Sequence, residues 1–195
     1  MKKIGIRQLL SCLLMLLIIL SGTLVTGIPA LGASSVTIYW NDMKQEMDGF
    51  GCSGAFHQAN NLMNFPEPGR TEMLDLLFSQ TSGAGLSIVR NNVGDSGVWG
   101  DEIDGPNPSI EPSKGTWNWT GDEDQIWFMN EAKSRGCTRF MSTVWSPPAW
   151  MKTNGTVENG GNLKTSEYQS FADYLSAYVR GYKTHHNIDI YAISL

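Results

Sequence analysis

From residue 48 onward, the sequence alternates between segments patterned like strands and segments patterned like helices. This alternation constrains the fold more than any other feature. Short β-branched and apolar runs indicate strands, and apolar residues at helical spacing indicate helices. We expect strands over residues 48–54, 86–90, 138–144 and 190–195, and helices over residues 71–78, 123–134 and 166–185. Such an order predicts an α/β fold with a parallel sheet and right-handed crossovers.

Two architectures fit this order, a (β/α)8 barrel and a doubly wound sheet. Both place their functional site in the loops that follow the carboxyl ends of the strands. A long loop rich in Gly, Pro, Asp and Asn spans residues 91–115, directly after the second strand. Long loops in compact domains are usually functional, so we expect the site there and after the third strand. The order of the strands in space is not encoded in the pattern.

The first 33 residues have the composition of a secretory signal peptide. A basic head with Lys2, Lys3 and Arg7 precedes an apolar run over residues 9–20, and small residues follow through Ala33. The alternative is a membrane anchor, but the run is shorter than the roughly 20 residues that span a bilayer. We therefore expect residues 1–33 to be a signal peptide, the protein to be secreted, and no stable membrane anchor.

Charge and aromatic content favour a carbohydrate ligand. The chain has 14 basic and 19 acidic residues, and without residues 1–33 the net charge would change from −5 to −8. An acidic chain does not neutralise phosphates, so we expect no nucleic-acid partner. All seven Trp lie after residue 33. Because indole faces stack on the C–H faces of pyranose rings and acidic side chains bind hydroxyls, a polysaccharide is the expected partner.

Three short motifs suggest other chemistry, and none of them is favoured. Residues 49–54 match the G-x-G-x-x-G pattern of dinucleotide sites, but no buried apolar strand precedes them. Ser53 lies in a near match to a hydrolase nucleophile elbow that lacks its second glycine. Asp101, Glu102 and Asp104 could ligate calcium, although a solvated loop is the plainer interpretation. We expect no cofactor and no metal.

Arg90 and two tryptophans are the candidate site residues. Arg90 closes an apolar strand, where a guanidinium can hold a catalytic carboxylate ionised and oriented; a structural salt bridge is the alternative. Trp145 directly follows a strand and is braced by two prolines, so it could form a sugar platform. Packing in the core is the alternative for Trp145 and more so for Trp150.

At these residues the chain resembles glycoside hydrolase family 30. The matching stretches are Asp48-Gly-Phe-Gly51, Ser87-Ile-Val-Arg90 with Asp95 after it, Trp145-Ser-Pro-Pro-Ala-Trp150-Met-Lys-Thr-Asn154-Gly155, and Tyr191-Ala-Ile-Ser-Leu195. They occur in the family's order across nearly all of the chain after residue 33. The stretch that begins at Trp145 is the most specific, and the chain is most similar to the xylan-degrading members.

The resemblance implies the barrel, with a β-sandwich side domain. Residues 34–47 would supply the N-terminal strand or strands of the side domain. Residues 48–195 would form the first half of the (β/α)8 barrel, about four βα units, ending within the fourth strand. The barrel would place Cys52 and Cys137 at opposite ends of non-adjacent strands, farther apart than the roughly 7 Å that a disulfide allows, so both thiols are expected to be free.

The resemblance also implies retaining hydrolysis by two carboxylates about 5–5.5 Å apart. Arg90 would support the nucleophile, Trp145 would line the subsite of the cleaved sugar, and Asp95 would bind a sugar hydroxyl. The acid/base Glu is expected in an Asn-Glu-Pro segment after Leu195, and the nucleophile Glu follows the seventh strand. We therefore assign no catalytic residue within the 195 residues.

The leading hypothesis is a secreted retaining glycoside hydrolase acting on xylan or glucuronoxylan, with the 195-residue chain inactive by itself. Alternatives within the family are an endo-1,6-glucanase, an endo-1,6-galactanase and a glucosylceramidase-like enzyme. A non-catalytic carbohydrate-binding protein that uses Trp99, Trp145 and Trp150 is the alternative outside the enzymes. The sequence indicates no protein partner.

Overall fold

The computed structural model describes residues 36–56, 58–99 and 106–195. The predicted signal peptide and the candidate calcium ligands Asp101, Glu102 and Asp104 lie outside these residues. By its internal contacts the chain divides into two units, Met1–Glu46 and Met47–Leu195. No helix in the described part of the chain is both long enough and apolar enough to cross a membrane.

Within the first unit, the described residues form no strand. Residues 36–40 form no strand, and the backbone N–H of Asp42 donates to the carbonyl of Tyr39 in a turn, at 3.0 Å. A strand needs a neighbour for its backbone groups, and none of the described residues pairs with this segment. The assignment of residues 34–47 to a β-sandwich side domain stays a prediction.

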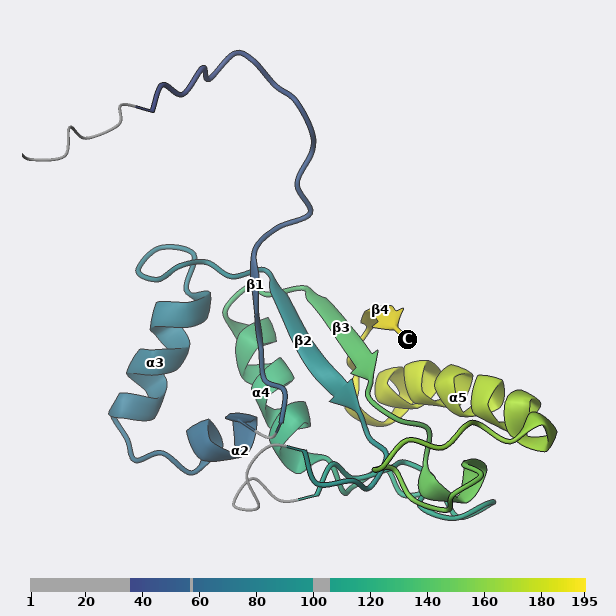
Figure 1. The fold of residues 1–195 in the computed structure, drawn as a ribbon. Helices are drawn as coiled ribbons and strands as arrows, with labels where there is room; N and C mark the ends of the chain where they lie inside the picture. The colour runs from purple at the N-terminus through teal and green to yellow at the C-terminus, as the bar shows by residue number, and fades with distance from the viewer. Residues whose placement is uncertain (1–35, 57, 100–105) are drawn as a thin grey trace, which may run out of the picture. The chain divides into compact units, whose positions relative to one another are not determined.

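The second unit is built on a four-stranded parallel sheet whose order in space is the order in sequence (Figure 1). The strands are β1 (Gly51–Ser53), β2 (Ile88–Val93), β3 (Arg139–Val144) and β4 (Ile190–Ser194). A doubly wound sheet reverses its strand order beside the first strand, whereas a barrel adds each strand next to the last. The observed order confirms the expected fold, the first half of a (β/α)8 barrel.

Helices connect successive strands. They are α2 (Gln58–Met63) and α3 (Gly69–Phe78) between β1 and β2, α4 (Glu123–Ser134) between β2 and β3, and α5 (Tyr168–His186) between β3 and β4. The three predicted helices are confirmed to within two residues at each end. Helix α2 was not predicted, because its asparagines and the nearby prolines indicate a loop or a broken helix. It forms where Ala59 is buried and where α2 packs against α4.

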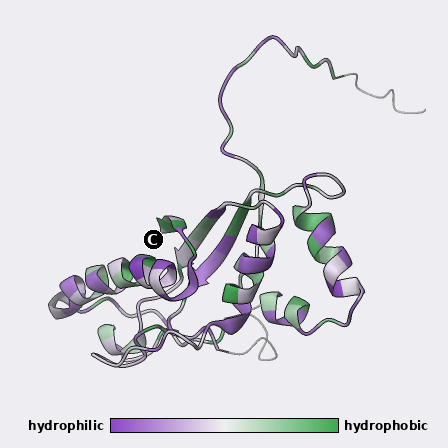
Figure 2. Cartoon of the chain, turned by 180° about the vertical axis from the view of Figure 1, so that it is seen from behind, coloured by the Kyte–Doolittle hydropathy of each residue, from purple (hydrophilic) through white to green (hydrophobic). Residues whose placement is uncertain are grey.

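The two faces of the sheet differ in what they carry. Val89 of β2 and Phe140 of β3 are register partners and are almost fully buried on the helix-covered face. Because side chains alternate along a strand, Arg90 and its partner Met141 lie on the opposite face. Helix α5 alternates between hydrophilic and hydrophobic residues along its length, as a helix covering one face should (Figure 2).

Three buried tyrosines at four-residue spacing dock α5 onto the helix-covered face. The hydroxyl of Tyr174 donates to the carbonyl of Gly94, and the hydroxyl of Tyr178 bonds to that of Ser142. The hydroxyl of Tyr182 donates to the carboxylate of Asp122. Gly94 directly follows β2, and Ser142 lies in the second half of β3. These bonds therefore connect the helix to the carboxyl half of the sheet, beside the predicted site.

Cys52 and Cys137, the cysteines within the described residues, are both free, as expected. Cys52 is half-buried in β1 and Cys137 is buried just before β3. Burial raises the pKa of the Cys52 thiol to about 11 and also raises the pKa of Cys137.

Candidate active site

Arg90 is held in place by the neighbouring strand. Its Nε donates a 2.8 Å hydrogen bond to Oγ1 of Thr143, which lies on the same face of the sheet, one pleat further along β3. Among the described residues the two terminal nitrogens of Arg90 make no hydrogen bond. The guanidinium is thus fixed by one edge, and its other edge is open to a carboxylate.

Trp145 lies beside Arg90 at the end of β3. The guanidinium carbon of Arg90 is 4.9 Å from the centroid of the Trp145 ring, a cation–π contact. The ring of Phe56, which follows β1, meets the indole edge-on with centroids 5.1 Å apart. Trp145 remains 40% exposed between these two contacts. An indole that is fixed and still accessible can serve as a platform for a sugar ring.

Sequence reasoning missed both neighbours of this pair. Thr143 is recognised only through the register of β2 and β3, and Phe56 only through the closeness of the loops that follow β1 and β3. Phe56 has a φ of 29°, a backbone conformation that residues other than glycine seldom adopt. Such strain is concentrated at functional sites, but the sequence carries no signal for it.

Asn92 adds a polar group to the same face. It is the register partner of Thr143 and is fully buried. Neither its side-chain oxygen nor its side-chain nitrogen has a hydrogen-bond partner within the described residues. Buried amides are normally paired, and leaving one unpaired costs about 1–3 kcal/mol. The sequence pattern did not single out Asn92.

Asp95 is used inside its own loop. Its side chain is 1% exposed and accepts hydrogen bonds from the backbone N–H of Gly97 at 2.8 Å and from the indole of Trp99 at 2.9 Å. Burial raises the pKa of Asp95, and these hydrogen bonds oppose that effect. The carboxylate therefore positions Trp99, and its expected role as a ligand of a sugar hydroxyl stays a prediction.

Trp150 connects two loops of the site region. Its indole nitrogen donates a 2.9 Å hydrogen bond to the carbonyl of Glu111, and its ring packs partly against the core. The ammonium of Lys114 lies 5.6 Å from the ring centroid. The structure therefore brings Arg90 and Trp145 into contact, while Asp95 and Trp150 organise the loops around them.

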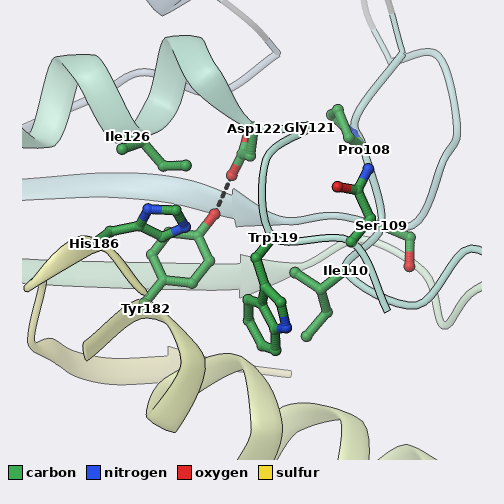
Figure 3. Close-up of a pocket in the computed structure, with 10 residues that line it drawn as sticks. Pro108, Ser109, Ile110, Trp119, Gly121, Asp122, Ile126, Tyr182 and His186 are labelled. Carbon is green, nitrogen blue, oxygen red and sulfur yellow. Dashed lines mark hydrogen bonds between the residues drawn. The ribbon is translucent and has the colours of Figure 1, made fainter. Parts of the chain in front are cut away.

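An enclosed cavity near these loops is not a substrate site. It lies between the 108–122 loop, α4 and α5, and its lining includes Trp119, Asp122, Tyr182 and His186 (Figure 3). Its volume is about 10 Å³, enough for about one water molecule. In the described part of the chain, no cluster of three or more His, Cys, Asp or Glu side chains could hold a metal ion.

Comparison with known sequences places this arrangement in a family. Residues 47–195, which include all four strands, match the family described as Glycosyl hydrolase family 59. The chain belongs to glycosyl hydrolase family 59. The match contains both members of the Arg90–Trp145 pair.

Curated relatives of this family 59 chain include galactocerebrosidases. That of Canis lupus familiaris is 32% identical over 153 residues, covering 75% of this chain and 21% of the relative. That of Homo sapiens is 29% identical over 174 residues, covering 86% of this chain and 23% of the relative. The chain thus spans about a fifth of the length of these relatives.

Solved structures support the resemblance to family 30. The catalytic domain of the family 30 xylanase C from Talaromyces cellulolyticus is 32% identical with a TM-score of 0.60, covering 76% of this chain and 36% of that one. The endo-beta1,6-glucanase BT3312 has a TM-score of 0.66 at 24% identity, which bears on the fold alone. Family 30 structures and family 59 sequences therefore both resemble this chain.

Proposed function

We propose that the protein carrying this chain is a retaining glycoside hydrolase that cleaves a β-linked glycan. The observation that carries the proposal is the contact between Arg90, within β2, and Trp145, directly after β3, in a glycosyl hydrolase family 59 chain. An exposed, fixed indole and an arginine with unused donors are the parts that a sugar subsite next to a carboxylate nucleophile needs.

Each residue has a distinct role in this proposal. Trp145 stacks on the sugar whose glycosidic bond is cleaved. The free nitrogens of Arg90 bind the nucleophile carboxylate, which keeps it ionised and correctly oriented. Thr143 fixes the guanidinium and Phe56 fixes the indole, so both act through the residues they touch.

The two catalytic carboxylates are proposed to lie beyond Leu195. Two buried acids of the loop after β2 are engaged within that loop, Asp95 by the N–H of Gly97 and the indole of Trp99, and Glu111 by a 2.7 Å hydrogen bond from the N–H of Gly115. A retaining enzyme needs two carboxyl groups about 5–5.5 Å apart across the scissile bond. The small share of the relatives that the chain covers leaves room for both.

Xylan or glucuronoxylan is the proposed substrate, and a β-galactoside is the second candidate. Identity to xylanase C supports the first, and the family 59 match together with the galactocerebrosidase relatives supports the second. Secretion is part of the proposal and rests on the composition of residues 1–33.

The test uses the full-length protein with glucuronoxylan, β-1,6-glucan and 4-nitrophenyl β-D-galactoside. We expect turnover of at least one substrate, with the β-anomer of the product appearing first by proton NMR. Trp145→Ala should lower kcat/KM at least about tenfold, because the sugar loses its stacking partner. Trp40→Ala is the matched control, since Trp40 is 82% exposed and belongs to the first unit. No turnover on any substrate, or first release of the α-anomer, contradicts the proposal.

A further inference from the structure

Three aromatic rings form a stack away from the Arg90–Trp145 pair. Trp117 and Trp119 lie in the loop before α4, and their rings are 5.9 Å apart with planes inclined by 5°. Trp119 continues the stack onto His185 in the last turn of α5, at 4.7 Å and 17°. The stack therefore joins a loop to the end of a helix 66 positions after Trp119 in the sequence.

The inner end of this stack is rigidly seated. Trp119 packs directly over Gly181 of α5, where an added Cβ would lie only 2.0 Å from the indole. His186 lines the small cavity beside Trp119. Between the two tryptophans, Oδ1 of Asn118 accepts 3.0 Å hydrogen bonds from the N–H and O–H of Thr120. The indoles are thus held in place without a ligand.

The outer end of the stack is accessible. Trp117 is 45% exposed. The cavity beside Trp119 holds about one water, so no sugar ring can be enclosed there and a ligand must lie across the surface (Figure 3). Lys114, three residues before Trp117, is paired with Glu167 at 2.8 Å. A neutral molecule with flat apolar faces and many hydroxyls fits this surface.

We propose that Trp117, backed by Trp119 and His185, is a second carbohydrate-binding surface that holds a polysaccharide chain. The stack rests on α5, which packs against the helix-covered face of the sheet, whereas Arg90 lies on the opposite face. A glycan bound at the stack is therefore separate from the bond being cleaved. The ligand class follows from membership of a glycosyl hydrolase family together with the open, flat shape of the surface.

The test is native electrophoresis of the full-length protein through gels containing glucuronoxylan, β-1,6-glucan or arabinogalactan. All variants carry Trp145→Ala, so that binding at the cleavage site does not mask the second surface. We expect at least one polysaccharide to retard the parent. Trp117→Ala should raise the apparent Kd about tenfold, which corresponds to the loss of one aromatic stacking contact. Trp117→Phe should retain most of the binding, and Trp40→Ala should retain all of it.

Two further measurements make every outcome decisive. His185→Ala removes the exposed ring behind Trp119 and should weaken binding, but less than Trp117→Ala does. It provides an independent test if the circular-dichroism spectrum shows that the Trp117→Ala variant is unfolded. The proposal is overturned if a folded Trp117→Ala variant is retarded as much as the parent, or if no gel retards the parent. With Trp145 restored, Trp117→Ala should leave kcat/KM for 4-nitrophenyl glycosides unchanged. Absence of turnover with retardation that depends on Trp117 would count against the proposed hydrolysis alone.

Discussion

Arg90 shows at the scale of one residue what a sequence can and cannot predict. Its residue type and its place at the end of the predicted strand over residues 86–90 were enough to select it, although β2 continues beyond it to Val93. Trp145 was selected because it directly follows a predicted strand. Thr143 and Phe56 were not selected, because each matters only through a contact between separate strands or loops. Contacts of this kind depend on register and on loop path, which residue types do not encode.

The bond between Arg90 and Thr143 makes a prediction about catalysis. Thr143→Val keeps the shape of the side chain but removes the acceptor for Arg90 Nε, so the guanidinium loses its orientation. We expect kcat/KM of the full-length enzyme to fall at least about tenfold, consistent with one hydrogen bond to a charged group. Thr143→Ser keeps the hydroxyl and should stay within about twofold of the parent. Equal rates for the Val and Ser variants would show that this contact does not position Arg90.

Cys52 gives a prediction about pH. The pKa of this thiol is raised to about 11, mainly because the thiol is buried. The folded protein therefore holds less Cys52 thiolate than the unfolded chain does at any pH below about 11. Since the thiolate is the nucleophile, alkylation of Cys52 by iodoacetamide should be slow at pH 8 and should still rise about tenfold from pH 9 to pH 10. Peptide mass spectrometry measures the rate, and the urea-unfolded protein is the control. A rate that levels off near pH 9 in the folded protein would refute the shift.

Among the elements, those with strong local signals were predicted closely. Helix α4 begins and ends where expected, because acidic residues open its first turn and Gly136 follows its last. The polar segment that contains α2 gave no such signal, and its helix is held by packing against α4. Strand β1 is shorter than predicted, with only three residues, Gly51 to Ser53, pairing with β2.

A side chain of α4 continues the sheet where β1 stops. Gln125 is buried, and its amide accepts from the N–H of Asn92 at 2.8 Å and donates to the Asn92 carbonyl at 3.3 Å. Gln125 therefore acts as a substitute for the next peptide of β1 and couples the start of α4 to the end of β2.

Removal of that amide should destabilise the fold. Gln125→Met conserves volume but leaves the buried N–H of Asn92 without this acceptor, at about 1–3 kcal/mol for an unpaired group, while the Asn92 carbonyl keeps a 3.4 Å hydrogen bond from the hydroxyl of Tyr178. We expect the free energy of unfolding in urea, followed by tryptophan fluorescence, to fall by about 2 kcal/mol or more. The control is Gln169→Met, which removes an exposed bond to Asp173 within α5 and should cost about 0.5 kcal/mol or less. If Gln125→Met lowers the free energy of unfolding no more than Gln169→Met does, the Gln125 side chain does not replace a peptide of β1.

For the whole molecule, the pattern predicted parallel βα units but could not choose between a barrel and a doubly wound sheet. The resemblance to family 30 implied the barrel, and the observed order from β1 to β4 confirmed it. In a four-stranded sheet of this order, β1 and β4 are the outer strands. Tyr191 of β4 is 58% exposed, and an open apolar groove of 290 Å³ lies between β4 and α5, lined by Leu175, Ser176, Val179, Ile193 and Leu195.

These exposed groups predict how the 195-residue chain behaves when it is produced alone. Outer strands with accessible backbone groups and apolar neighbours tend to pair with other chains. We expect concentration-dependent association in sedimentation velocity, and Tyr191→Lys, which places a charge on β4, should shift the chain towards monomer. Leu76→Lys is the matched control, since Leu76 is 63% exposed on α3, away from the sheet edge. A chain that stays monomeric at all concentrations, or equal association of both variants, would show that the edge of β4 is not the contact.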